Sequence, residues 1–118
     1  MSDAQWRRLT ETSTRRLPDG RVTPHYDPAM VQQFISHPTD YDIWPHYNAL
    51  KIPVLCLHGV ESDLVLDETI AAMRHSGPGA AGRLQVMEVA ACGHAPALNV
   101  ADQLSRVSDF IAASTEAA

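Results

Sequence analysis

The sequence has 118 residues, enough for at most one domain with a single core, and its 45% hydrophobic and 19% charged residues are typical of a globular protein. The net charge is −5: residues 1–59 carry six charges of each sign, whereas residues 60–118 carry three basic and eight acidic ones. This balance argues against a nucleic-acid-binding surface. No apolar run approaches the roughly 20 residues that span a bilayer, and the N-terminus lacks the apolar stretch of a signal peptide. The sequence therefore predicts a cytoplasmic protein with neither nucleic acid nor membrane as a partner.

The first 50 residues contain turn and helix signals but little apolar periodicity at their start. Pro18-Asp19-Gly20 is a turn signal, which predicts a short hairpin between residues 13–16 and 21–23. Asp27-Pro28 is a helix start, and His37-Pro38 is the matching stop. The apolar face of this predicted helix would comprise Met30, Val31, Phe34 and Ile35. A shorter helix is predicted from Asp42, with inward positions at Ile43, Trp44, Tyr47 and Leu50.

From Pro53 onward the pattern is strand, helix, strand, helix. Residues 54–57 and 84–89 are apolar runs of strand length, and the first lacks polar alternation, as in a strand covered on both faces. Asp67 is expected to cap the helix between them, with a break at residues 76–79. Asn99 is expected to cap the last helix, whose buried stripe would comprise Leu104, Val107, Phe110 and Ile111. This order predicts two parallel strands joined by a right-handed crossover, and such a pair needs further strands to be stable.

The two cysteines lie in the second half of the chain. Cys56 falls inside the first predicted strand, where a thiol behaves as a small hydrophobic side chain, and Cys92 falls in the loop after the second strand. A reducing compartment favours free thiols at both positions. A disulfide between them is the alternative.

An aspartate and a histidine follow the two predicted strands. Asp63 comes shortly after residues 54–57, and His94 comes after residues 84–89, 31 positions further along the chain. Because the carboxyl ends of parallel strands share one edge of the sheet, we expect the Asp63 carboxylate within hydrogen-bond reach of the His94 ring. Such a pair is two thirds of a nucleophile–histidine–acid triad: His94 as general base, and Asp63 fixing its tautomer.

Other assignments of these loops are open. Ser62 is interpreted as a loop-stabilising hydroxyl, and Glu61 or Asp67 could replace Asp63 as the acid. Cys92 lies too close to His94 along the loop to be aligned by it as a nucleophile. A zinc site is an alternative for His58, Asp63, Cys92 and His94, although no tight ligand-pair spacing is present. Trp44 and Tyr47 are interpreted as core residues, with a substrate pocket as the alternative.

The two loops resemble those of the α/β-hydrolase superfamily. Leu55-x-Leu57-x-Gly59-x-x-Ser62-Asp63 is similar to the family's acid loop, and Gly93-His94-Ala95-Pro96 to its histidine loop. A third stretch, residues 19–28, is similar to the segment that leaves the cap in some bacterial members. The resemblance implies an α/β fold in which residues 1–50 are a cap remnant with connecting helices. Residues 51–118 would then be the C-terminal β-α-β-α part of the core.

The resemblance also implies a function, with Asp63 as triad acid and His94 as triad base in ester or related acyl hydrolysis of a small-molecule substrate. No metal or organic cofactor is implied. The family's G-x-S-x-G nucleophile elbow does not occur in the 118 residues, nor does a cysteine version of it. We therefore expect a fragment that is inactive alone and needs a partner carrying the N-terminal half. The alternative is a non-catalytic module that associates with a partner or a second copy through its open sheet edge.

Overall fold

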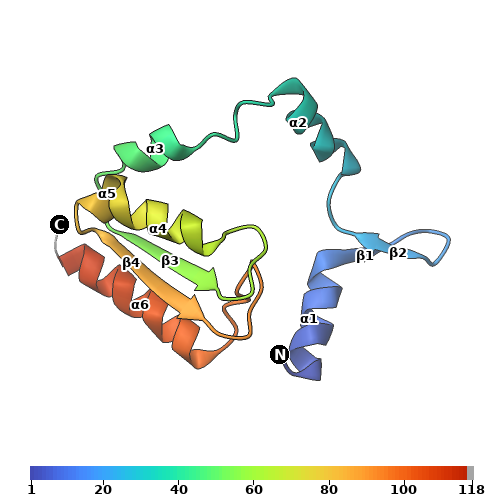
Figure 1. The fold of residues 1–118 in the computed structure, drawn as a ribbon. Helices are drawn as coiled ribbons and strands as arrows, with labels where there is room; N and C mark the ends of the chain where they lie inside the picture. The colour runs from blue at the N-terminus through green and yellow to red at the C-terminus, as the bar shows by residue number, and fades with distance from the viewer. Residues whose placement is uncertain (117–118) are drawn as a thin grey trace. The chain divides into compact units, whose positions relative to one another are not determined.

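A computed structural model describes residues 1–116, which form two compact units (Figure 1). The first unit comprises Met1–Tyr41, and the second begins at Asp42. The sequence predicted a different boundary, at residue 50, between a cap remnant and the hydrolase core. That boundary stays a prediction. By packing, the helix that precedes residue 50 belongs with the second unit.

The first unit consists of a helix, a hairpin and two short helical turns. Helix α1 (Asp3–Ser13) is followed by β1 (Thr14–Arg16) and β2 (Val22–Pro24), which pair antiparallel as predicted, with Arg15 opposite Thr23. Sequence analysis missed α1, although a capping box marks its start. The Ser2 hydroxyl accepts from the backbone N–H of Gln5, and the Gln5 side chain accepts from the N–H of Ser2.

The helix predicted after Asp27 is split and its apolar face is open. The Asp27 carboxylate does cap it, accepting from the N–H of Ala29 at 2.9 Å. A 3₁₀ turn, η1 (Pro28–Val31), leads into the short α2 (Gln32–Ser36). Phe34 stacks on Tyr41, but the four apolar residues of this face are between 53% and 69% exposed. The apolar pattern is correct, and no element of the first unit covers it.

The second unit is an α/β layer built on two parallel strands, as predicted (Figure 1). Strands β3 (Val54–Gly59) and β4 (Leu84–Val89) pair in register along their whole length, from Val54 opposite Leu84 to Gly59 opposite Val89. Helices α4 (Asp67–His75) and α5 (Gly77–Ala80) connect the strands, and α6 (Ala101–Glu116) follows β4. Ile70 of α4 and Val89 of β4 are the buried hydrophobic residues of the described chain.

Helices α4 and α6 differ from the sequence predictions in three details. Leu66 occupies the cap position of α4, so Asp67 is its first helical residue and stabilises the helix through the dipole instead. Helix α6 begins at Ala101, two residues after Asn99. Within α6, Leu104 and Ile111 are more than half exposed, whereas Gln103 is buried because its side chain accepts the N–H of Leu98. Part of the predicted stripe therefore faces solvent, and the hydrogen bond of Gln103 is a contact that periodicity cannot detect.

No helix among residues 1–116 has the length and apolarity that crossing a membrane requires.

Helix α3 (Trp44–Ala49) is attached to the connecting helices through Tyr47. The Tyr47 hydroxyl donates to the carbonyl of Met73 at 2.9 Å, and Gly77, whose φ is +45°, lies against the backbone of Asn48. Burial raises the pKa of the Tyr47 hydroxyl; a backbone hydrogen bond from Gly79 opposes this, and the Cys56 thiol adds to it. The folded state therefore favours the neutral phenol.

This shift predicts a loss of stability at alkaline pH. A folded-state pKa above the unfolded value means that stability is fully present below about pH 10, the ordinary tyrosine pKa, and falls as the pH rises through it. We expect the free energy of unfolding to fall between pH 8 and 10.5, and to fall less in Tyr47→Phe. Urea denaturation at the two pH values measures this. Tyr26 is 58% exposed, so the free energy of unfolding of Tyr26→Phe should fall with pH as much as that of the unaltered protein. An equally large fall in Tyr47→Phe would contradict the role of Tyr47 in the loss of stability.

Candidate active site

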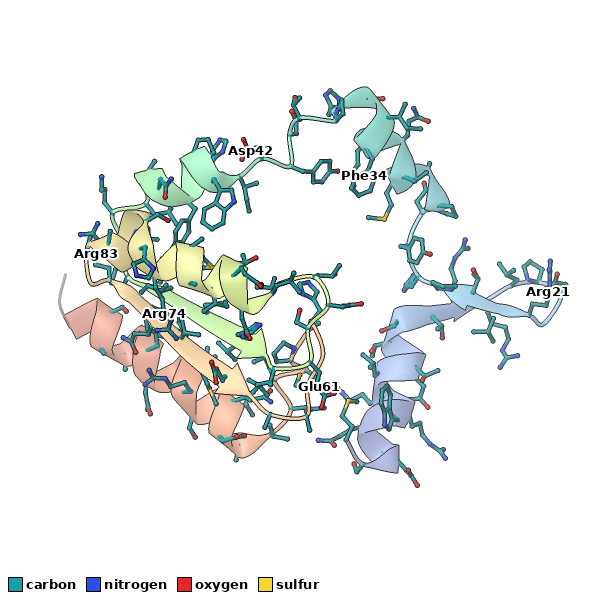
Figure 2. The ribbon with its side chains drawn as sticks, viewed as in Figure 1. Arg21, Phe34, Asp42, Glu61, Arg74 and Arg83 are labelled. Carbon is teal, nitrogen blue, oxygen red and sulfur yellow. The ribbon has the colours of Figure 1, made fainter. Side chains whose placement is uncertain are left out.

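The loops that follow β3 and β4 are joined by backbone hydrogen bonds at the carboxyl end of the sheet. Val60 donates to the carbonyl of Val89 at 3.1 Å, which continues the parallel ladder. Glu61 then donates to the carbonyl of Cys92 at 2.9 Å, and Figure 2 shows Glu61 in this loop region. The first bond joins the strand ends, and the second joins the loop that carries Asp63 to the loop that carries His94.

Gly59 makes this close approach possible. A Cβ atom at position 59 would lie 1.9 Å from the carbonyl oxygen of Gly93 and 2.6 Å from that of Cys92. Real Cβ atoms do not approach backbone so closely, so the absence of a side chain is required here. The glycine that ends β3 therefore allows the short distance between β3 and the loop that contains Cys92 and Gly93.

Ser62, and not Asp63, is the hydrogen-bond partner of His94. The Ser62 Oγ lies 3.4 Å from the His94 Nδ1, a long hydrogen bond. Among residues 1–116 no hydrogen bond or ion pair joins the side chains of Asp63 and His94, and both residues are exposed. The expected carboxylate–imidazole hydrogen bond is thus not formed in this structure. The roles of Asp63 as acid and His94 as base stay predictions.

The orientation of Ser62 has a local cause. Its Oγ accepts the N–H of Val65 at 3.0 Å and that of Leu64 at 3.4 Å, while its own N–H donates to the carbonyl of Gly59. A serine at the start of a tight turn commonly bonds the backbone two or three residues ahead. The sequence signal was therefore present, and the interpretation of Ser62 as a loop-stabilising hydroxyl describes part of what it does.

His58 is buried next to this turn. It is 4% exposed, its Nε2 lies 2.8 Å from the carbonyl oxygen of Val65, and its Nδ1 is buried without a hydrogen-bond partner. Since a carbonyl can only accept, Nε2 carries the proton. His58 thus holds the far end of the loop that contains Ser62 and Asp63.

The residues of the alternative acid, thiol, zinc and pocket assignments lie at separate positions in the fold. Asp67 lies in the first turn of α4, and Cys56 and Cys92 are free thiols. Burial raises the pKa of the Cys56 thiol, an effect that the Arg74 charge partly offsets. Among the side chains that the structure describes, three or more histidine, cysteine or acidic residues do not gather as metal ligands, so the set considered for zinc is not assembled. Trp44 and Tyr47 pack edge to face, with ring centroids 5.7 Å apart.

A shallow hollow of about 260 Å³ lies beside the Ser62 turn. It is lined by His58, Val60, Ser62, Val65, Leu66, Asp67 and Glu68. Asp63 and His94 do not line it. A hollow of about 430 Å³ in the first unit lies at Arg15 and residues 25–28, and it contains none of the predicted site residues.

Comparison with known proteins finds a related sequence and a related solved structure, although no protein-family model matches the chain. A 3-hydroxybutyrate-oligomer hydrolase from Cupriavidus necator is 33% identical over an alignment of 78 residues, and the match covers 61% of this chain and 25% of that protein. The crystal structure of an alpha/beta hydrolase from Novosphingobium aromaticivorans superposes with a TM-score of 0.72 at 26% identity. That match covers 92% of this chain and 38% of the other. The chain thus spans well under half the length of both relatives.

The parallel β3–β4 pair with its helices is therefore a hydrolase-type α/β arrangement, and it matches part of an α/β-hydrolase fold. The chain is related to the α/β-hydrolase superfamily, as the acid-loop and histidine-loop patterns implied.

The contact at Gly59 predicts the effect of adding one methyl group. Gly59→Ala should lower the free energy of unfolding by about 3 kcal/mol or more, because the new Cβ meets rigid backbone and the two loops must separate. Gly93→Ala is the matched control, since a Cβ there meets nothing within 4 Å. Urea denaturation of both variants measures the difference. Equal stability of the two would show that the loops are not packed as described.

Proposed function

We propose that this chain carries the general base and the acid of an ester hydrolase. His94 would accept the proton of a nucleophile and pass it to the leaving group, and Asp63 would hold the His94 ring and stabilise the imidazolium. The observation that carries the proposal is the Glu61–Cys92 backbone hydrogen bond, which holds the two loops together at the carboxyl edge of a hydrolase-type parallel pair. α/β enzymes place their sites at this edge.

The proposed substrate is an ester between small hydroxy acids. Support comes from the Cupriavidus relative, whose name states that it hydrolyses oligomers of 3-hydroxybutyrate. Hydrolysis of such an ester needs an acyl-accepting nucleophile, a base and an oxyanion hole, and the 118 residues lack the G-x-S-x-G pattern that supplies the first and part of the third. In the proposed mechanism these groups come from another polypeptide segment, and no metal or organic cofactor takes part.

Two measurements test this function. The 118-residue chain alone should hydrolyse 3-hydroxybutyrate dimer or p-nitrophenyl esters no faster than free imidazole, because nucleophile and oxyanion hole are missing. A chimera in which a stretch of this chain that includes Asp63 and His94 replaces the corresponding part of the Cupriavidus hydrolase should hydrolyse the dimer. In that chimera His94→Ala and Asp63→Asn should each lower kcat by about 10³-fold or more.

His75→Ala is the control for the chimera, because His75 bonds only the carbonyl of Ala71 in its own helix. It should retain full activity. A chimera whose activity survives His94→Ala would overturn the assignment of the base. Saturable hydrolysis by the chain alone would show that it contains its own nucleophile.

A second candidate function is association without catalysis. Each of β3 and β4 has one strand neighbour, so each leaves an unpaired backbone edge, and such edges pair readily with other strands. Large apolar side chains are also exposed in the second unit, among them Ile52, Val60, Leu64 and Leu66, which are 50% to 69% exposed. The proposed partner is a second copy or a polypeptide that carries the N-terminal half of the hydrolase fold.

Association predicts a concentration-dependent mass. We expect sedimentation equilibrium to show dimers or larger species of the 12.9 kDa chain, because apolar side chains and strand edges face water. Leu57→Pro in β3 should weaken this association if the free edge of that strand is used. Val54 and Val60 donate to β4, so the N–H of Leu57, an odd number of residues away from both, faces the free edge, and proline removes that donor. A monomer at all concentrations with a sharp cooperative melt would exclude this function.

A further inference from the structure

A chain of hydrogen bonds runs from the buried His58 ring to the candidate base. His58 Nε2–H donates to the carbonyl of Val65 at 2.8 Å, and the N–H of Val65 donates to Ser62 Oγ at 3.0 Å. Ser62 Oγ in turn lies 3.4 Å from His94 Nδ1. The first two bonds use both polar backbone groups of Val65, so the buried ring fixes the position of the serine hydroxyl.

The donor in the bond between Ser62 and His94 follows from the number of lone pairs and hydrogens on the hydroxyl group. A hydroxyl oxygen has two lone pairs and one hydrogen. Both lone pairs of Ser62 are used by the N–H groups of Leu64 and Val65. The hydroxyl hydrogen therefore remains for His94, and Ser62 donates to Nδ1. A neutral imidazole whose Nδ1 accepts a hydrogen bond carries its proton on Nε2.

We infer that Ser62 is a positioning residue that holds His94 in the Nε2–H tautomer, in competition with Asp63 for Nδ1. In a working triad the opposite tautomer is needed, with Nδ1–H donating to the carboxylate and Nε2 free to accept a proton. The Ser62-bound arrangement is thus a resting state. It becomes productive when the ring leaves the Ser62 hydroxyl and donates Nδ1–H to Asp63, whose side chain makes none of the hydrogen bonds or ion pairs among the described residues.

The catalytic consequence rests on the proposed role of His94, but the tautomer can be measured without any activity. Two-bond ¹H–¹⁵N spectra of the ¹⁵N-labelled 118-residue chain at pH 8 distinguish a ring nitrogen that carries a proton from one that does not. The six histidines are assigned with His→Ala variants. The unaltered chain should show His94 with its proton on Nε2.

Ser62→Ala is the deciding variant. It removes the donor to Nδ1, and we expect the His94 Nδ1 signal to move toward the protonated position as Asp63 takes over. Ser76→Ala is the matched control, since the Ser76 hydroxyl donates to the carbonyl of Ala72 within its own helix region, and it should leave the His94 signals unchanged. Unchanged His94 signals in Ser62→Ala, or a proton on Nδ1 in the unaltered chain, would overturn the inference.

His58→Phe tests the buried end of the hydrogen-bond chain. The ring is retained in size but cannot donate to Val65, so we expect faster amide exchange at Val65 and a His94 shift in the same direction as in Ser62→Ala. Native amide signals of residues 54–57 report that β3 is still folded. The result is separable from the proposed function: loss of hydrolysis in the His94→Ala chimera tests the base, whereas the tautomer of the chain alone tests Ser62.

Discussion

The close packing of Gly59 against the backbone of Cys92 and Gly93 is the constraint on which the candidate site depends. Strand pairing alone brings the ends of β3 and β4 to neighbouring positions, but it does not bring the loops beyond them into contact. The missing side chain lets the carbonyl groups of the second loop approach, so that Glu61 can donate to Cys92. The contact between Ser62 and His94 depends on this close approach of the two loops.

Backbone hydrogen bonds and buried residues hold the loops of the site, whereas its two candidate catalytic side chains are exposed. His58 and Gly59 are buried, and they fix the two ends of the acid loop through Val65 and the second loop. Asp63 and His94, by contrast, are exposed and unpaired with each other. A triad needs its carboxylate and imidazole preorganised in a dry environment, because an exposed ion pair contributes little. In the proposed hydrolase, the segment that brings the nucleophile would also exclude water from this pair.

The relatives share only part of their length with this chain. The match to the Novosphingobium hydrolase covers 92% of this chain but 38% of that protein. Fold likeness does not by itself carry an activity, which depends on specific side chains in a site. For this reason the substrate and the reaction are proposals that rest on the activity for which one relative is named and on the two loops.

The sequence alone determined the parallel strands, the crossover helix between them and the two loops at one sheet edge. These features follow from local signals: apolar runs of strand length, capping residues, and glycine and proline at the breaks. The fold relationship was likewise visible in the acid-loop and histidine-loop patterns. The start of α1 is also encoded locally, in the capping box at Ser2 and Gln5.

Only the tertiary structure decided which side chains meet. Asp63 and Ser62 are adjacent, so no periodicity distinguishes which of them faces His94; the amides of Leu64 and Val65 turn the serine hydroxyl toward the ring. The burial of His58 and Gln103 accompanies single hydrogen bonds, to the carbonyl of Val65 and from the N–H of Leu98. The contact between Ser62 and His94, which are 32 residues apart, joins two loops whose proximity is set by the packed fold, and that is why a pattern along the chain could not reveal it.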